Sequence, residues 1–291
     1  MIPAQNIIAW GNNVPWAEQR QVEQDLIISR AIVAIFSAPL LSAELRFRGG
    51  TALNKLHFVV PMRYSEDLDL VRTANGPIGP ILDGIRGVLE SWLGRAQFDQ
   101  SPVAPKLRFR VDAEDQSAAA PIRLKVEINT REITAFDPPR AIHFRVKNPW
   151  FTGAVDVPTF SREEMLATKL RALLQRDKGR DLFDLAHALD EFEGLDAARL
   201  VTCFGAYLEQ SGQALTRAQA QERMFAKLAN PRFLTDMRPL LPAAQSDLLT
   251  DNSTKVAFRK VFTQIIDLIP GDPWVRLAEM NERFGLDTKA N

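Results

Sequence analysis

The stretch F-R-G-G-T-A-L-N-K-L-H-F-V-V-P-M-R-Y-S-E-D-L-D-L, residues 47–70, decides the fold. It predicts a short strand that ends at Gly49-Gly50, a helix directly after the glycines, and a second strand over Y-S-E-D-L-D-L-V. In a strand, side chains two residues apart share a face, so we expect Asp67 and Asp69 to point together while the leucines beside them enter the core. The pattern therefore predicts two carboxylates next to a glycine turn.

These two carboxylates favour metal-dependent chemistry on a nucleotide. A pair of aspartates so placed can bridge two Mg²⁺ ions about 3.5–4 Å apart, which organise a triphosphate and activate an attacking hydroxyl. Gly49 and Gly50 let backbone amides approach a phosphate, and Thr51 offers a hydroxyl at the start of the helix. A tight turn or a solvated strand edge explains either motif alone, but the two motifs together across one helix favour a nucleotide site.

A third acidic residue, Glu127, is a candidate to complete the metal site. The run I-R-L-K-V-E-I-N alternates apolar and polar residues, which predicts a strand with Glu127 on its polar face. A carboxylate on a neighbouring strand is what a two-metal site needs. The alternative is a surface residue that pairs with Lys125 or Arg131, and the sequence leaves both interpretations open.

A second informative stretch is S-R-E-E-M-L-A-T-K-L-R-A-L-L-Q-R-D-K-G-R-D-L-F-D-L, residues 161–185. Lys169 flanks an apolar stripe, so its amine is expected to reach an interior cleft, although a lysine there can also extend to solvent. Gly179 is expected to end the helix in a left-handed turn, which places Asp184 in the first turn of the next helix, near Lys169 or Arg180. Basic residues cluster at this turn, either to bind a triphosphate or an RNA backbone or as a solvated helix end: Arg176, Lys178 and Arg180.

The order of the predicted elements gives the fold class and the domains. Strands with strict alternation dominate up to about residue 148, and everything after Pro158 has the pattern of helices and loops. We expect an α+β fold, with a mixed-sheet domain over residues 1–158 and an all-helical domain over residues 159–291.

Composition bounds the partners and the compartment. Lysine plus arginine and aspartate plus glutamate both total 36, so a polyanion must be held by a local patch and not by a global field. The single Cys203 lies among apolar residues and is expected to be a buried free thiol. Without a signal-peptide pattern or a run of about eighteen apolar residues, we expect a cytoplasmic protein with no membrane partner.

The quoted motifs resemble those of the AbiEii/MenT-like nucleotidyltransferase toxins of bacterial toxin–antitoxin systems, which belong to the polymerase-β nucleotidyltransferase superfamily. The resemblance lies in F-R-G-G-T-A-L-N-K-L, in R-Y-S-E-D-L-D-L, in K-L-R-A-L-L-Q-R-D-K-G-R-D-L-F-D-L and in the earlier Q-V-E-Q-D-L-I-I-S-R. It covers residues 20–190, and the last hundred residues carry no motif of this kind.

This resemblance implies an enzyme that uses magnesium to transfer nucleotides from a nucleoside triphosphate (NTP) to RNA. The implied acceptor is the 3′ end of tRNA, and its modification blocks aminoacylation and translation; a cognate antitoxin is the implied protein partner. Asp67 and Asp69 would then be metal ligands and Lys169 and Asp184 catalytic. The implied nucleotide site is lined by Gly50, Thr51 and Ser65.

Ser65 and the acceptor each leave alternatives open. Ser65 lies two residues before Asp67 on the same strand face, and its phosphorylation would add about −1.5 to −2 charges beside the metal site. An antitoxin could silence the enzyme in this way, or Ser65 could simply bind nucleotide or begin the strand. Other functions are transfer to a small molecule or a protein hydroxyl, or a non-catalytic module that binds a nucleotide or a partner.

Overall fold

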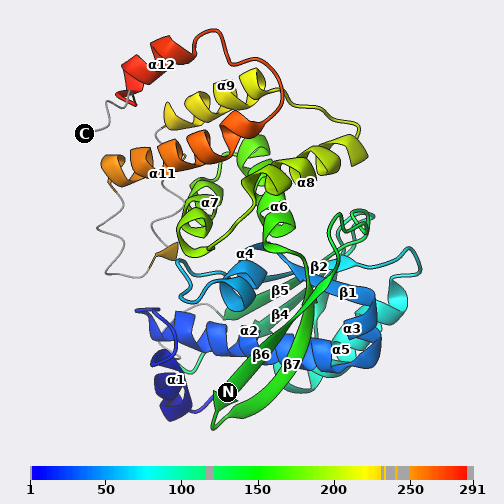
Figure 1. Ribbon diagram of the computed structural model, residues 1–291. Coiled ribbons are helices and arrows are strands. Elements are labelled where there is room, and N and C mark those ends of the chain that lie inside the picture. Colours follow the sequence, from blue (N-terminus) through cyan, green and yellow to red (C-terminus); the bar gives the residue numbers. More distant parts are fainter. Residues whose placement is uncertain (1, 116–120, 231–232, 234–239, 242–249, 287–291) are drawn as a thin grey trace. The chain divides into compact units, whose positions relative to one another are not determined.

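The computed structural model describes residues 2–115, 121–230, 233, 240–241 and 250–286 of the chain. The chain divides into two compact units, a sheet unit over Met1–Ser161 and a helical unit over Arg162–Asn291. In Figure 1 the sheet unit runs from blue to green and the helical unit from green to red. The boundary expected near residue 158 falls inside the last strand of the sheet, β7 (Phe151–Thr159).

The sheet unit is built on seven strands in the order β3-β4-β5-β2-β1-β7-β6. Strand β1 pairs antiparallel with β2 and parallel with β7, and β2 pairs parallel with β5, so the sheet is mixed. This confirms the α+β class predicted from the sequence. The other strands in chain order are β1 (Leu45–Arg48), β2 (Asp67–Arg72), β3 (Gln97–Asp99), β4 (Lys106–Val111), β5 (Ile122–Asn129) and β6 (Arg140–Asn148).

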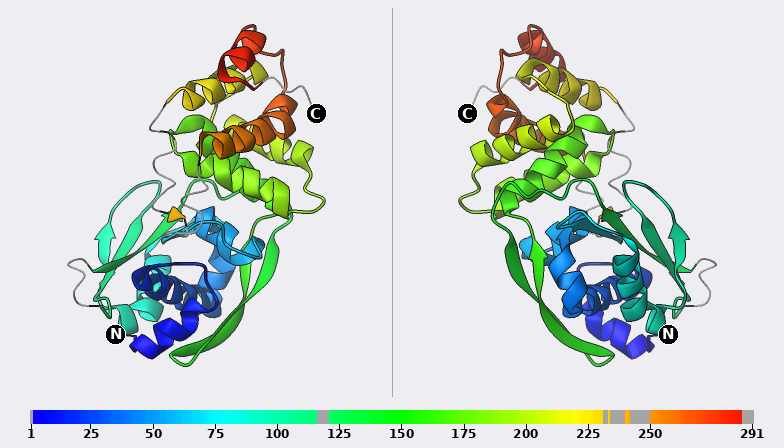
Figure 2. Two further views of the ribbon diagram at one scale, coloured as in Figure 1. Left: turned by 90° about the vertical axis from the view of Figure 1, so that its left-hand side faces the viewer. Right: turned by 90° about the vertical axis from the view of Figure 1, so that its right-hand side faces the viewer.

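Alternating burial along the strands shows why these residues form a sheet with one covered face. In β5 every second residue, from Ile122 to Ile128, is fully buried, and the charged residues between them are not. Helix α2 contacts β5, β6, β7 and helix α5, and α5 also contacts β4, so these two helices cover the apolar face. Figure 2 shows the long β6–β7 hairpin, in green, along one side of this unit. The helices of the unit are α1 (Ala4–Gly11), α2 (Gln19–Ser37), α3 (Pro39–Glu44), α4 (Gly49–Ala52), a π-helical turn η1 (Leu53–His57) and α5 (Gly79–Leu93).

The helical unit packs around aromatic side chains. Phe225 lies at the centre of a cluster of rings, with its centroid 5.4 Å from that of Phe258 and 5.5 Å from that of Phe262. Cys203 is fully buried and forms no disulfide, as predicted. The elements are α6 (Arg162–Gln175), α7 (Gly179–Glu191), α8 (Ala197–Gln210), α9 (Arg217–Leu228), α11 (Asp251–Gln264), η3 (Ile266–Leu268) and α12 (Leu277–Phe284).

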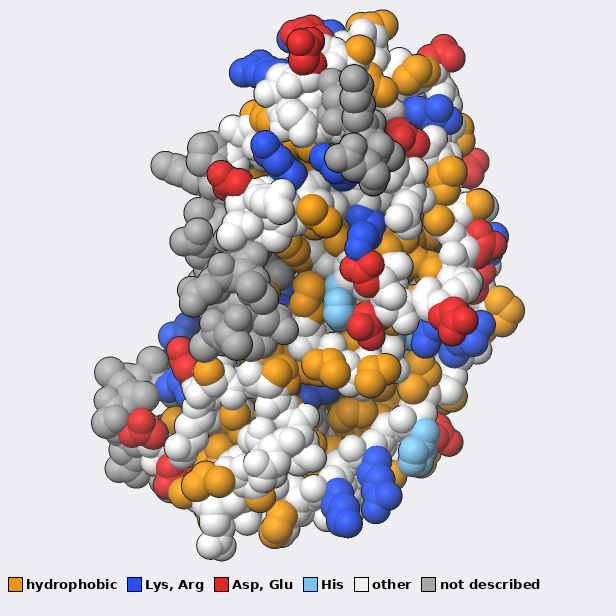
Figure 3. All heavy atoms as spheres, turned by 60° about the vertical axis from the view of Figure 1, so that its left-hand side comes forward, with side chains coloured by type: hydrophobic (Ala, Val, Ile, Leu, Met, Phe, Trp, Pro, Cys, Tyr) orange, Lys and Arg blue, Asp and Glu red, His pale blue; other side chains and the backbone are white. Residues whose placement is uncertain are grey.

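Charge and hydropathy of the described residues agree with the balanced composition. On the face shown in Figure 3, basic and acidic side chains are interspersed, with no broad area of one sign. None of the helices in the described ranges is both long and apolar enough to cross a membrane.

Candidate active site

The glycine turn lies directly against an aspartate of the neighbouring strand. Gly49 follows β1 and has φ +87°, a backbone conformation that residues other than glycine rarely adopt. A Cβ atom at Gly49 would lie 2.9 Å from Cγ of Asp69, and Arg48 is the register partner of Asp69 in the β1–β2 ladder. Only glycine therefore allows the chain to turn this close to the carboxylate.

The two aspartates of β2 point to the same face, as the spacing predicted, and Leu68 and Leu70 are each 1% exposed. The Asp67 side chain is 41% exposed, and its carboxylate forms an ion pair with Nζ of Lys125 at 2.9 Å. Asp69 is half-buried, and its carboxylate has no hydrogen bond or ion pair with any described residue. The two neighbouring carboxylates thus have different electrostatic surroundings.

The surroundings of Asp69 favour its protonated form. Burial raises the pKa of Asp69, and the negative charges of Asp67 and Glu127 raise it further, while Lys125 and Arg48 oppose them. A positive ligand at this carboxylate would relieve both effects. The site therefore contains a carboxylate whose ionised form a bound cation would stabilise.

Thr51 and Ser65 lie together at the start of the helix that follows the glycines. Their hydroxyl oxygens are 2.8 Å apart, and the Thr51 hydroxyl also donates to the backbone carbonyl of Asp67. Thr51 is 1% exposed. Because Thr51 already bonds within the site, it fixes the glycine turn to β2, and the half-buried Ser65 is the more accessible hydroxyl.

Glu127 lies beside the aspartates but is engaged with lysines. It is the register partner of Asp69 in the β2–β5 ladder, and its Oε2 lies 3.2 Å from Nζ of Lys125 and 3.4 Å from Nζ of Lys106. The alternative pairing with Lys125 is thus observed. Within the described ranges, no group of three histidines, cysteines, aspartates or glutamates is arranged to hold a metal ion, so the role of Glu127 as a third ligand stays a prediction.

The two aspartates nevertheless fit a magnesium ion. Carboxylate oxygens are the donors that Mg²⁺ prefers, and this cation is usually bound by one or two carboxylates with waters and substrate phosphates as its other ligands. The carboxylate of Asp69 and the exposed carboxylate of Asp67 meet that requirement without Glu127.

Sequence reasoning missed a buried arginine at this site. Arg63 is 3% exposed, and a Cβ atom at Gly50 would lie 2.5 Å from one of its terminal nitrogens and 3.3 Å from Oγ of Ser65. The missing side chain of Gly50 therefore makes room for a guanidinium beside the glycine turn. The signal was present as the arginine of R-Y-S-E-D, a cation within the metal motif.

A second missed group anchors the helix after the glycines. Lys55, in the π-helical turn η1, pairs with Asp25 of α2 at 2.6 Å. The buried Asp25 carboxylate also accepts hydrogen bonds from the indole nitrogens of Trp10 at 2.8 Å and Trp16 at 3.0 Å. These contacts tie the N-terminal segment to the helix that carries Thr51.

In the helical unit, Lys169 and Asp184 come together as predicted. Nζ of Lys169 lies 2.8 Å from Oδ2 of Asp184 and 3.4 Å from Oδ1 of Asp181, and all three side chains are at most 7% exposed. Arg176 completes the cluster with a bidentate contact to Asp181 at 2.8 and 2.9 Å. Two cations and two carboxylates thus balance one another, with Lys169, Asp181 and Asp184 buried and Arg176 exposed.

The expected role of Gly179 is wrong. Its φ is not positive; α6 ends at Gln175, and Gly179 is the first residue of α7. Residues 176–178 make the turn instead, and Lys178 takes an extended conformation that ends it. Asp181, not Asp184, is the acidic residue in the first turn of α7.

The basic residues at this turn have different surroundings. Lys178 is exposed and Arg180 half-buried, so both have access to an anionic ligand, whereas Arg176 contributes its guanidinium to the Asp181 pair. The structure therefore brings Arg176 into the Lys169 cluster and leaves the nucleotide-binding role of all three as a prediction.

Comparison with known proteins identifies the family. The family model described as nucleotidyl transferase AbiEii toxin, type IV toxin–antitoxin system, matches residues 30–264. The chain belongs to the AbiEii nucleotidyltransferase toxin family. It is thus a nucleotidyltransferase-family enzyme and a toxin of a type IV toxin–antitoxin system, and among curated proteins none matches it.

Solved structures share the fold of this AbiEii-family chain at low sequence identity. MenT4, a nucleotidyltransferase toxin from Mycobacterium tuberculosis H37Rv, is similar with a TM-score of 0.63 and 16% identity, over 98% of this chain and 99% of that chain. JHP933 from Helicobacter pylori is similar with a TM-score of 0.57 and 17% identity, over 93% of this chain and 98% of that chain. The fold therefore extends over the last hundred residues, where no motif was recognised.

Proposed function

We propose that this AbiEii-family toxin is a magnesium-dependent enzyme that transfers nucleotides from an NTP to RNA, with the 3′ acceptor end of tRNA as its target, and so blocks translation. The observation that carries the proposal is the glycine turn at Gly49 held against the carboxylate of Asp69. The backbone amides of the glycine turn could bind a phosphate, and the adjacent Asp69 carboxylate could bind a cation.

In this mechanism, residues of the sheet unit bind the cation and orient the triphosphate. Asp67 and Asp69 would hold Mg²⁺, which when bound neutralises triphosphate charge and lowers the pKa of an attacking hydroxyl. The amides at Gly49 and Gly50 and the hydroxyl of Ser65 orient the triphosphate. Arg63 adds positive charge beside Gly50, where charge on the phosphates develops during transfer.

The helical unit contributes a lysine held by carboxylates. Because Lys169 is fixed by Asp181 and Asp184, it loses little side-chain entropy when it meets a phosphate. The exposed Lys178 and the half-buried Arg180 favour a polyanionic acceptor such as RNA over a small molecule. A cognate antitoxin is the partner that membership of a type IV system implies.

The proposal is tested by incubating the full chain with purified tRNA and each radiolabelled NTP in the presence of magnesium. We expect label at the tRNA 3′ end, and none with the Asp69→Ala variant or with a chelator. Parallel reactions contain total RNA, protein extract and small metabolites. Label in protein or metabolites would replace RNA as the acceptor, and the absence of pyrophosphate release with every acceptor would contradict transfer itself.

A further inference from the structure

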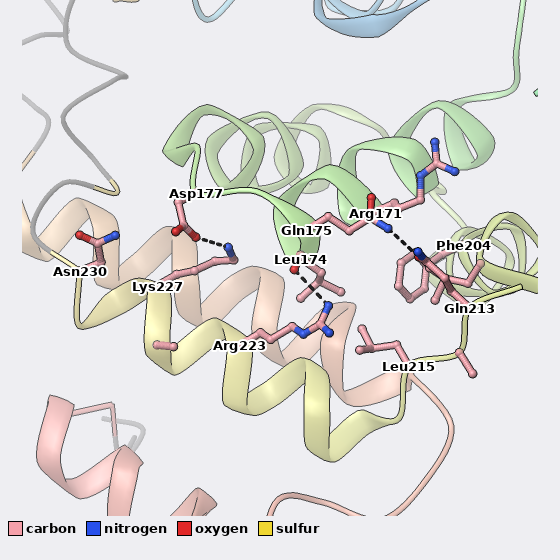
Figure 4. A pocket seen from close by; sticks show the side chains of 13 residues that line it. Arg171, Leu174, Gln175, Asp177, Phe204, Gln213, Leu215, Arg223, Lys227 and Asn230 are labelled. Atoms are coloured by element: carbon pink, nitrogen blue, oxygen red, sulfur yellow. Dashed lines mark hydrogen bonds and ion pairs between the residues drawn. The ribbon is translucent and has the colours of Figure 1, made fainter. Parts of the chain in front are cut away.

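The helical unit contains a pocket that the proposed transfer does not use. Its volume is about 860 Å³, within the range of about 300–1,000 Å³ that small-molecule sites occupy. Residues of α6, α8 and α9 line it, together with the segment between α8 and α9. In Figure 4, Arg223 and Lys227 reach from α9 toward the C-terminal end of α6.

Arg223 supplies free donors to this pocket. It is exposed, and its one hydrogen bond within the described part of the chain runs from one terminal nitrogen to the Leu174 carbonyl at 3.4 Å. A guanidinium has five N–H donors in a planar fork that matches a phosphate. Most of these donors therefore remain available to an anionic ligand.

Lys227 adds a second cation with an exchangeable partner. Its side chain is 7% exposed, and Nζ donates to the Arg176 carbonyl at 2.9 Å and to Oδ1 of Asp177 at 2.7 Å. The Asp177 side chain is 66% exposed. A phosphate oxygen can replace this solvated carboxylate at little cost, because it keeps the charge contact that Lys227 already makes.

Other parts of the lining suit a nucleobase. The Gln175 amide nitrogen donates to the Gln213 amide oxygen at 2.9 Å, which leaves the exposed amide nitrogen of Gln213 for the edge of a base. Leu208 and Leu215 offer apolar surface to the face of a ring. The pocket thus combines phosphate-binding cations, an amide pair and apolar surface in one cavity.

We propose that this pocket is a second nucleotide-binding site, which takes the phosphate and base of a free nucleotide or of one nucleotide in an RNA strand. Its phosphate would contact Arg223 and Lys227, and its base would lie against Leu215 and the Gln175–Gln213 amide pair. An acidic peptide would match the two cations but would leave the apolar surface without a flat partner. A nucleotide satisfies both parts of the lining.

The test measures binding to the full chain in the presence of a chelator, so that metal-dependent binding at Asp67 and Asp69 makes no contribution. The four ribonucleoside 5′-monophosphates are titrated by calorimetry, and a labelled single-stranded RNA of about ten nucleotides by fluorescence anisotropy. Arg223→Ala is expected to weaken binding by about tenfold or more, the loss typical of a charge-assisted hydrogen bond. The matched control Arg283→Ala removes an exposed arginine that does not line the pocket and should leave affinity unchanged.

A second pocket variant tests whether weaker binding comes from the pocket itself or from local misfolding. Leu215→Glu places a negative charge in the pocket and is expected to weaken both probes, with the thermal unfolding profile unchanged. Binding of the monophosphates would identify a free-nucleotide site, and binding of the RNA alone would identify an RNA-strand site. Wild-type affinity in both pocket variants, the absence of binding by either probe, or tighter binding of a polyglutamate peptide than of either probe would overturn the proposal.

The same assay separates this inference from the proposed enzymatic function. Asp69→Asn should leave chelator-resistant binding intact while it abolishes transfer. Loss of binding in Asp69→Asn would show that the ligand binds in the sheet unit, and it would refute the second site. Intact binding that depends on Arg223, in a chain without transfer activity, would support the second site and contradict the proposed reaction alone.

Discussion

The sheet unit and the helical unit each hold a cluster of charged groups, but they compensate charge in opposite ways. In the sheet unit, Asp69 has no ion pair among the described residues, and burial and neighbouring carboxylates raise its pKa. In the helical unit, Lys169 is enclosed by Asp184 and Asp181, and Arg176 balances the second of these. The first cluster contains a carboxylate without an ion pair among the described residues, whereas Lys169 and both of its carboxylates are paired.

This difference indicates what each cluster does in the isolated chain. An uncompensated carboxylate costs folding free energy, which a bound cation would return, so the proposed metal-binding role of the β2 aspartates predicts that a cation stabilises the fold. A complete buried cluster holds its side chains in one arrangement, so Lys169 is positioned before any ligand arrives. Variants that remove one partner should therefore affect activity and stability differently in the two units.

The largest expected effect is on activity in the sheet unit. Asp69→Asn removes the charge that holds the cation, and nucleotidyl transfer should fall on the order of 10³-fold. Radiolabel incorporation into tRNA measures it. Asp83→Asn, at an exposed carboxylate of α5, is the matched control and should retain full activity; wild-type rates for Asp69→Asn would remove this residue from the mechanism.

In the helical unit, the first effect of a single substitution should be on stability. Lys169→Met removes the ion pair between Lys169 and the buried Asp184 and should lower the free energy of unfolding by about 3–5 kcal/mol, measured by urea denaturation. The double variant Lys169→Met/Asp184→Leu should recover most of that loss. Transfer should stay lost in both variants; recovery of activity in the double variant would show that Lys169 is structural only.

The glycine turn should show a smaller, combined effect. Gly49→Ala forces a side chain into a positive-φ conformation against Asp69 and should destabilise the sheet unit by about 1–3 kcal/mol, with a raised KM for NTP. Thermal unfolding and steady-state kinetics measure the two effects. Gly87→Ala in α5 meets no atom within 4 Å and should instead stabilise slightly. Equal behaviour of the two variants would argue against a constrained turn.

A charge at Ser65 tests whether the aspartate site can be switched off. Ser65→Asp adds a negative group near Asp67 and should reduce transfer about tenfold or more, because it repels triphosphate. Ser65→Ala removes only a hydroxyl and should cost a few-fold at most. Wild-type activity in the Ser65→Asp variant would contradict regulation by phosphorylation at this position.

The smallest effect concerns pH and stability. A raised pKa means that ionised Asp69 destabilises the fold, fully above its folded pKa and not at all below the ordinary carboxyl value. Asp69→Asn should therefore raise the Tm by about 2–4 °C at pH 7, and this gain should vanish as the pH falls below about 4. A constant gain at all pH values would exclude ionisation of Asp69 as its cause.

The fold was largely predictable where local pattern and tertiary environment agree. The alternation of β4 and β5 and the D-L-D-L register of β2 gave the correct faces, because one face of the sheet is covered and the other is not. Strand β7 was missed because Gly153 and Pro158 resemble a loop. Its pairing with β1 is limited to Thr159, and Pro158 lies opposite Ala141 in the β6–β7 ladder.

The candidate site was less predictable, because several of its contacts depend on packing between distant segments. The approach of Lys169 and Asp184 followed from a helical reversal, although Gly179 does not make it. Three of these contacts cannot be inferred from the spacing of apolar residues along the chain. They are the contact of Arg63 with Gly50, the ion pair of Asp25 with Lys55, and the ion pairs of Glu127 with lysines. Helices α1, α3 and α12 are at most eight residues long, too short for their apolar spacing to mark their ends in the sequence.

The Asp25 contacts also link the fluorescence of two tryptophans to the glycine turn. Trp10 and Trp16 share one carboxylate with Lys55, whose helical segment begins at the glycine turn. Any ligand that shifts this segment changes the field on two indole rings and hence their emission. Occupancy of the turn should thus be visible in tryptophan fluorescence without a label, independently of the reaction that the enzyme catalyses.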